Sequence, residues 1–184
     1  MLRALAACAL ASASASASAA AAAGVMNAEP CNRTDANQLW RLNATHGAAT
    51  HQLAVLASSP SSAEERCAAI VVGGGCAVAD FAFVSTAACA PAACAEAQAF
   101  DVLDHATRLP APAGEPCASC VVRSRLNSSL CFGVGAELGG VQWRVSAPTA
   151  AGEQTLEMVG AFEKLCLASG FEPSAYPISL QECE

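Results

Sequence analysis

Few stretches of the chain after residue 23 place hydrophobic residues at the three- and four-residue spacing of a helix, and glycine, proline, serine and asparagine interrupt the chain every ten residues or so. Such punctuation favours short strands joined by turns, and the spacing of these strands suggests a sandwich or a barrel. The strands that this pattern predicts are 39–42, 52–56, 68–72, 81–85, 100–103, 141–145, 155–159 and 165–168. We therefore expect an all-β fold.

Residues 87–99 depart from this pattern. Their alanine, glutamate and glutamine content favours a helix locally, but Pro91 interrupts it. The sequence predicts a loop or one helical turn here.

A weak internal repeat combines glutamine with a nearby aromatic residue. Gln38 stands two residues before Trp40, and similar pairs occur at Phe100 and Trp143. A large ring once per repeat is typical of a three-lobed barrel in which the rings fill a shared core, while each glutamine bonds backbone groups of its own lobe. We expect Gln38, Trp40, Phe100 and Trp143 to be structural.

Charge excludes two classes of partner. The 184-residue chain carries 9 lysines and arginines against 16 acidic residues, a formal net charge of −7. Nucleic acid and anionic membrane surfaces require clustered cations, which this sequence does not supply. No nucleic-acid partner is expected.

Residues 1–23 resemble a secretory signal peptide. Arg3 is followed by leucines among alanines, and the stretch ends in three alanines before Gly24. The alternative is a low-complexity disordered leader, since the apolar stretch is weak. We expect one mature domain over 24–184, secreted to the extracellular space. After the leader, no apolar run in the sequence is long enough to span a membrane.

Two further features fit the secretory pathway. Asn32, Asn43 and Asn127 each begin an Asn-x-Ser/Thr sequon, a candidate site for a glycan. Of the 11 cysteines, all but Cys8 lie after the leader, and an even number in a secreted chain implies disulfides. Cys117-Ala-Ser-Cys120 also fits a redox pair or half of a zinc site, although no cofactor or metal is expected.

One segment carries a family resemblance. The run from Cys31 to Asn37-Gln38-Leu39-Trp40 resembles the end of a ricin-type lectin repeat, and the tail 165–183 is similar to its opening half. The resemblance implies a β-trefoil over about 29–183, a Cys166–Cys183 disulfide, and non-catalytic binding of glycans or glycoproteins. Its unusual order leaves open a permuted trefoil or a fragment of a longer protein.

The resemblance also suggests binding residues. Asn37 matches the family's amide ligand; Asp35 is a second candidate, although an aspartate there also suits a turn. Asp80, beside two phenylalanines, and Tyr176 are further candidates for a carboxylate and an aromatic platform. The family's aspartate after the opening cysteine is missing from these repeats, which supports a scaffold that has lost sugar binding.

Catalytic patterns are weak. The three histidines are expected on the surface and share no carboxylate partner, and no Gly-x-Ser-x-Gly motif occurs. The sequence therefore predicts a secreted, disulfide-stapled lectin-like module that is not an enzyme. The alternatives are a degenerate interaction scaffold and a small secreted hydrolase with an acid–base pair that the sequence does not reveal.

Overall fold

The structure is a computed structural model that describes residues 24–45, 50–59, 62–70, 82–89, 95–112, 114–134, 140–161, 163–170 and 175–183. The predicted leader 1–23 and Asp80 lie outside these residues. The described elements are β1 (Gly24–Pro30), η1 (Ala36–Gln38), β2 (Trp40–Ala44), β3 (Thr50–Ser59), β4 (Ser62–Ile70), β5 (Val84–Ala88), η3 (Ala95–Gln98), β6 (Phe100–Asp104), β7 (Cys117–Ser124), β8 (Leu130–Val134), β9 (Trp143–Val145), β10 (Leu156–Met158), β11 (Leu165–Gly170) and β12 (Ile178–Glu182). The predicted all-β class is confirmed, and the helical turn expected within 87–99 is the 3-10 turn η3.

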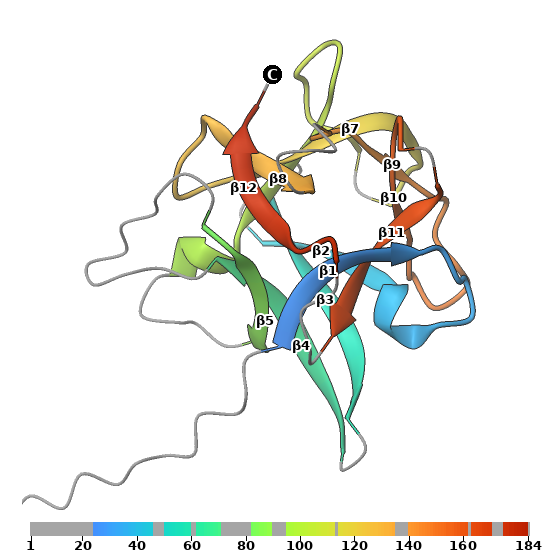
Figure 1. The fold of residues 1–184 in the computed structure, drawn as a ribbon. Coiled ribbons are helices and arrows are strands. Elements are labelled where there is room, and N and C mark those ends of the chain that lie inside the picture. The colour runs from blue at the N-terminus through green and yellow to red at the C-terminus, as the bar shows by residue number, and fades with distance from the viewer. Residues whose placement is uncertain are drawn as a thin grey trace, which may run out of the picture.

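The strands form a closed antiparallel barrel (Figure 1). Nine of them are hydrogen-bonded in the ring order β7-β6-β3-β4-β5-β1-β11-β10-β9, and the β7–β9 pairing closes the ring. Three more lie outside the ring: β2 pairs with β3, while β8 pairs with β7 and carries β12. Closure leaves the ring without the free edges that invite aggregation.

The predicted β-trefoil is wrong. The nine-stranded ring overturns it, and two strands outside the predicted set are responsible: β1 joins β5 to β11, and β7 joins β6 to β9. The ladder of backbone hydrogen bonds between strands therefore runs continuously from one predicted lobe into the next. In particular, β1 pairs with β11 from Val25↔Gly170 to Pro30↔Leu165, which brings sequence-distant segments together.

One hydrophobic core fills the barrel. Trp40, Trp143, Phe100 and Phe132 have no exposed surface and belong to the same cluster of buried side chains. The rings of Phe100 and Phe132 meet edge to face, with centroids 4.7 Å apart. This geometry is favourable for aromatic pairs and fixes β6 against β8.

Polar atoms of the core residues bond to the backbone. The indole N–H groups of Trp40 and Trp143 donate to the carbonyls of Leu167 (2.9 Å) and Phe132 (3.1 Å). The amide of Gln38 donates to the carbonyl of Pro30 at 3.0 Å and accepts from the N–H of Asn32 at 2.8 Å. The aromatic and glutamine pairs thus tie separate segments together, because each satisfies a backbone group that burial would otherwise leave unpaired.

Four disulfides join described residues: Cys31–Cys166, Cys67–Cys89, Cys117–Cys120 and Cys131–Cys183. The implied Cys166–Cys183 pair is therefore wrong. The strand register explains the observed pairs. Pro30 faces Leu165 in the β1–β11 pairing, which places Cys31 beside Cys166. Gln181 faces Cys131 in the β12–β8 pairing, which places Cys183 near Cys131. Strands β11 and β12 are not neighbours in the sheet.

A partly buried ion pair lies beside β3. Asp101 accepts hydrogen bonds from the Thr50 hydroxyl (2.9 Å) and from the Arg123 guanidinium (2.8 Å), and its own exposure is 4%. The neighbouring His51 is 1% exposed, so the expectation that it lies on the surface is wrong. It is covered because β3 is paired at this point with both β2 and β6. In the described part of the chain, no helix is long and apolar enough to cross a membrane.

The turn after β6 makes a pH-dependent contribution to stability. Asp104 accepts from the backbone N–H and the hydroxyl of Thr107, both at 2.9 Å, and these bonds hold the pKa of its carboxyl below the usual 3.8. A depressed pKa stabilises the fold above the unfolded-state pKa, and this contribution is lost as the pH falls toward the folded-state value. Carboxyl NMR titration should therefore give a pKa below 3.8 for Asp104.

The hydroxyl contribution is separable. Thr107→Ala should raise the Asp104 pKa part of the way back, since the bond from the backbone N–H of residue 107 remains, whereas Thr107→Ser should leave the pKa lowered. An Asp104 pKa at or above 3.8 in the wild-type protein would contradict this assignment.

Candidate functional site

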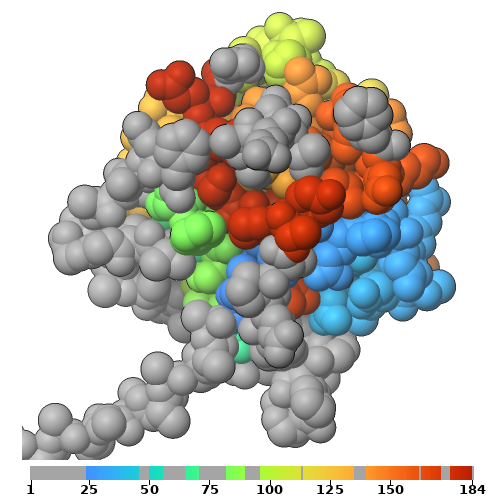
Figure 2. Space-filling model, viewed as in Figure 1, coloured from blue at the N-terminus to red at the C-terminus, as the bar shows by residue number. Residues whose placement is uncertain are grey.

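A cleft of about 580 Å³ opens between three segments that are distant in sequence. Its walls are the stretch between β1 and β2, the start of β7, and the β9–β10 hairpin. Figure 2 shows the blue residues of the amino-terminal segment lying against the orange and red carboxy-terminal strands. The lining residues are Arg33, Leu39, Pro116, Cys117, Ala118, Arg144, Val145, Ser146, Ala147, Thr149, Glu153, Thr155 and Glu157.

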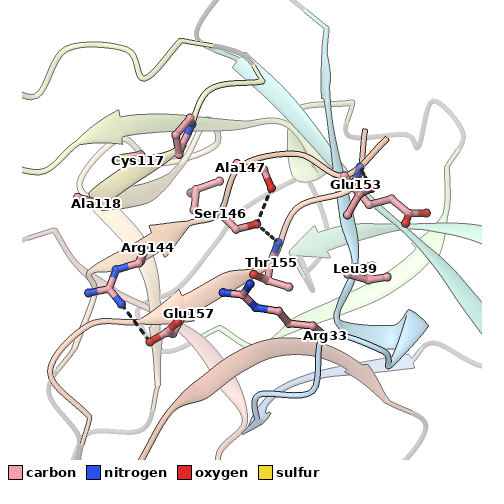
Figure 3. Close-up of a pocket in the computed structure, with 13 residues that line it drawn as sticks. Arg33, Leu39, Cys117, Ala118, Arg144, Ser146, Ala147, Glu153, Thr155 and Glu157 are labelled. Carbon is pink, nitrogen blue, oxygen red and sulfur yellow. Dashed lines mark hydrogen bonds and ion pairs between the residues drawn. The ribbon is translucent and has the colours of Figure 1, made fainter. Parts of the chain in front are cut away.

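The β9–β10 wall follows from strand alternation. Trp143 and Val145 point into the core, which turns Arg144 outward, and Glu157 stands directly opposite Arg144 in the register. Arg144 donates to the Glu157 carboxylate at 3.2 Å. This cross-strand ion pair lies on the surface beside the cleft, as Figure 3 shows.

The loop joining β9 to β10 is held by its own hydroxyl groups. The Ser146 hydroxyl accepts from the N–H of Thr155 at 2.9 Å, and the Thr149 hydroxyl accepts from the N–H of Glu153 at 3.2 Å. Gly152 supplies the left-handed conformation that the turn requires, with φ 78°. These bonds fix the loop shape before any ligand arrives.

The opposite wall is equally constrained. The Asn32 side chain accepts from the backbone N–H of Thr34 at 3.1 Å and from its hydroxyl at 2.7 Å, and Asp35 accepts from the N–H of Asn37 at 2.9 Å. Arg33 is the middle residue of the first of these two consecutive turns, which therefore fixes its backbone. The Cys31–Cys166 disulfide anchors the start of the segment to β11.

A backbone bridge joins the two walls. Trp40 and Gln154 exchange N–H to carbonyl hydrogen bonds, both of 2.8 Å, so the end of the Arg33 segment is paired with the β9–β10 loop. The side chain of Gln154 also donates to the Ser146 carbonyl at 2.7 Å. The cleft is therefore preformed rather than assembled by a ligand.

Charged side chains of both signs border the cleft. Glu157 is paired with Arg144, and Glu153 lies 3.6 Å from the guanidinium of Arg41. Within the described chain, no hydrogen bond or ion pair engages the guanidinium of Arg33. Figure 3 shows this side chain extending toward Thr155. Leu39, Pro116 and Val145 add apolar surface, so the cleft offers hydrogen-bonding groups over an apolar floor.

The predicted sugar ligands that the structure describes do not line this cleft. Asn37 and Asp35 are half-buried in the turn beside the cleft but do not line it, and the Asp35 carboxylate is engaged in capping η1. Tyr176 is 38% exposed just before β12, where its carbonyl accepts from the N–H of Ala28. Asp80 lies outside the described residues. Of the described candidates, none of Asn37, Asp35 and Tyr176 lines the cleft.

The remaining candidates have the following positions. Asn32 and Asn43 are exposed, and Asn127 is half-buried with its side-chain oxygen accepting from Ser129. Cys117 and Cys120 are joined across an irregularity in the β7–β9 pairing. Among the described residues, no group of three or more histidine, cysteine or acidic side chains is placed to hold a metal ion.

Sequence reasoning missed every charged residue of the cleft. A usable signal was present in residues 143–145 and 156–158, where two short apolar-charged-apolar triplets carry Arg144 and Glu157 at their centres. Arg33 gave no such signal because its position depends on turns formed by its neighbours.

Comparison of the chain with protein-family models, with curated proteins and with solved structures found no match. Inference about function therefore rests on the cleft and on the residues that build it.

Proposed function

We propose that this protein binds carbohydrate without catalysis, in the cleft between the Arg33 segment and the β9–β10 hairpin. The observation that carries this proposal is a preformed cleft of about 580 Å³ that combines hydroxyl, carboxylate and guanidinium groups with apolar side chains. Saccharides present closely spaced hydroxyls and small apolar C–H faces, so they require this mixture of short-range hydrogen-bonding groups and apolar surface.

The position of the resemblance supports the proposal. The stretch from Cys31 to Trp40, which resembles the end of a ricin-type lectin repeat, also supplies Arg33 and Leu39 to the cleft. Gln38 and Trp40 hold this stretch in place through their bonds to the Pro30 and Leu167 carbonyls. In the proposed function, the motif residues build the wall and their neighbours contact the sugar.

The covalent structure is compatible with an extracellular protein. Four disulfides link strands and loops of the described chain, and such bonds persist in oxidising compartments. The proposal therefore includes secretion, with residues 1–23 as the signal peptide and glycans or glycoproteins as the partners.

Filling the cleft should abolish binding. Ala118 is exposed on β7 and lines the cleft, so Ala118→Trp places an indole in the space that a sugar would occupy. The matched control is Ala106→Trp, at an exposed turn position outside the cleft. We expect a glycan-array screen to identify a ligand for the wild-type protein. Calorimetry with this ligand should show at least about tenfold weaker binding for the cleft variant alone. An affinity loss of this size corresponds to one or more well-placed polar contacts.

Two outcomes would contradict the proposal. Equal binding by both tryptophan variants would place the sugar site outside the cleft. Failure of the folded, oxidised wild-type protein to bind any glycan would favour the alternative that the barrel is an interaction scaffold without sugar binding.

A further inference from the structure

Arg33 is the cation in the cleft that forms no ion pair with another described side chain. The other three charged residues that line the cleft are each paired: Arg144 with Glu157 at 3.2 Å, and Glu153 with Arg41 at 3.6 Å. The Arg33 side chain is exposed; Arg33 lies within the turn that Asn32 closes, and the turn that Asp35 closes follows it. Its guanidinium is therefore available to a ligand.

This arrangement is notable because the whole chain is acidic, with a formal net charge of −7. An acidic protein repels anions at long range, so an unpaired guanidinium provides local attraction within the cleft. Guanidinium groups bind oxyanions through parallel N–H donors, and such charge-assisted bonds are stronger than bonds between neutral groups.

We infer that the cleft selects saccharides that carry an oxyanion, either a carboxylate or a sulfate group, and that Arg33 binds this group. The inference rests on the proposed carbohydrate function and specifies the class of sugar. The acidic group contacts Arg33, while hydroxyls of the same saccharide face Thr149 and Thr155 on the opposite wall.

Glu157 limits the strength of this selectivity. Its carboxylate holds Arg144, the second cation of the cleft, and adds a negative charge to the same wall. Removing that charge with Glu157→Gln frees Arg144 to join Arg33 in binding the oxyanion. The substitution should therefore increase affinity for acidic saccharides, an effect that a purely structural role for Glu157 would not produce.

The test compares three oligosaccharides of equal length: neutral galactose, galacturonic acid and sulfated galactose. The full chain is produced in a bacterial periplasm, where disulfides form and Asn32, next to Arg33, carries no glycan. The variants are Arg33→Gln, Arg33→Lys and Glu157→Gln, with Arg108→Gln as a charge-matched control at a turn outside the cleft. Affinities are measured by calorimetry, and thermal unfolding checks that each variant is folded.

The inference predicts that at least one acidic oligosaccharide binds about tenfold or more tightly than the neutral one. Arg33→Gln should remove that preference, and Arg33→Lys should retain part of it. Glu157→Gln should strengthen the binding of acidic oligosaccharides by about threefold. The control variant should bind as the wild-type protein does. Preference for galacturonate assigns a carboxylate, and preference for sulfated galactose assigns a sulfate.

Two results would overturn it, and they are distinguishable. Equal affinity for neutral and acidic oligosaccharides, unchanged by Arg33→Gln, would refute acid selectivity while leaving carbohydrate binding intact. If no oligosaccharide binds the folded protein and none is found on the glycan array, both the selectivity and the proposed function fail.

Discussion

Replacing Cys31 and Cys166 together by alanine is expected to lower the free energy of unfolding by about 4–5 kcal/mol, since a disulfide that closes a loop longer than 100 residues strongly restricts the unfolded chain. The two cysteines are 135 residues apart in sequence. The loss would be a large fraction of the 5–15 kcal/mol typical of a domain. Denaturant unfolding with the other disulfides intact measures it.

The matched control is the Cys117–Cys120 disulfide, whose cysteines are three residues apart. Because the loop it closes is short, its removal by two alanine substitutions should cost only about 2 kcal/mol. Cys166, Cys117 and Cys120 are buried and Cys31 is half-buried. Equal costs for the two pairs would show that loop closure does not set the stability of this barrel.

Trp40→Ala is the second substitution with a large expected effect. The side chain is fully buried, and its indole N–H donates to the Leu167 carbonyl at 2.9 Å. Truncation leaves a cavity and an unpaired carbonyl, so we expect a loss of about 3–5 kcal/mol in the free energy of unfolding. The same denaturant experiment measures this loss.

Two comparisons separate the contributions. Trp40→Phe keeps most of the ring volume but removes the N–H donor, and should cost about 1–3 kcal/mol. Leu109→Ala, at a side chain that is 64% exposed, should change stability by less than about 0.5 kcal/mol. A Trp40→Ala cost as small as that of Leu109→Ala would mean that Trp40 does not support the core.

The composition of the core could be predicted from the sequence, whereas the pairing of the strands could not. Trp40, Phe100 and Trp143 are large rings in a chain with only 5% aromatic residues, and burial of such side chains is strongly favourable wherever they stand. The β1–β11 pairing joins residues such as Glu29 and Cys166, and no local pattern encodes that neighbour.

The strands missed in the sequence share a physical reason. β8 is buried along its whole length, and β7 carries an irregularity between Cys117 and Cys120, so neither shows regular alternation. In β1 the polar Asn27 is completely buried. Without β1 and β7 the predicted strands could not close a ring, and the trefoil expectation came from the ricin-type resemblance and the repeated aromatic residues.

The predicted sugar ligands Asn37 and Asp35 stand in the same stretch of chain as two residues that line the cleft. Asn37 and Asp35 belong to the turn that shapes one wall, whereas Arg33 and Leu39 of the same stretch line the cleft. A sequence readily shows which residues form turns. It shows less readily which neighbouring side chains those turns expose. Predicting the wall from Arg144 to Glu157 would have required knowledge of the strand register.

Backbone amide NMR with a ligand identified on the glycan array tests the location of carbohydrate binding most directly. We expect titration to shift the amide signals of Arg33, Ser146, Thr155 and Glu157, and to leave those around Phe83 and Tyr176 unchanged. Shifts confined to the surface around Phe83 and Tyr176, with the cleft amides unmoved, would contradict the proposal that the cleft is the carbohydrate site.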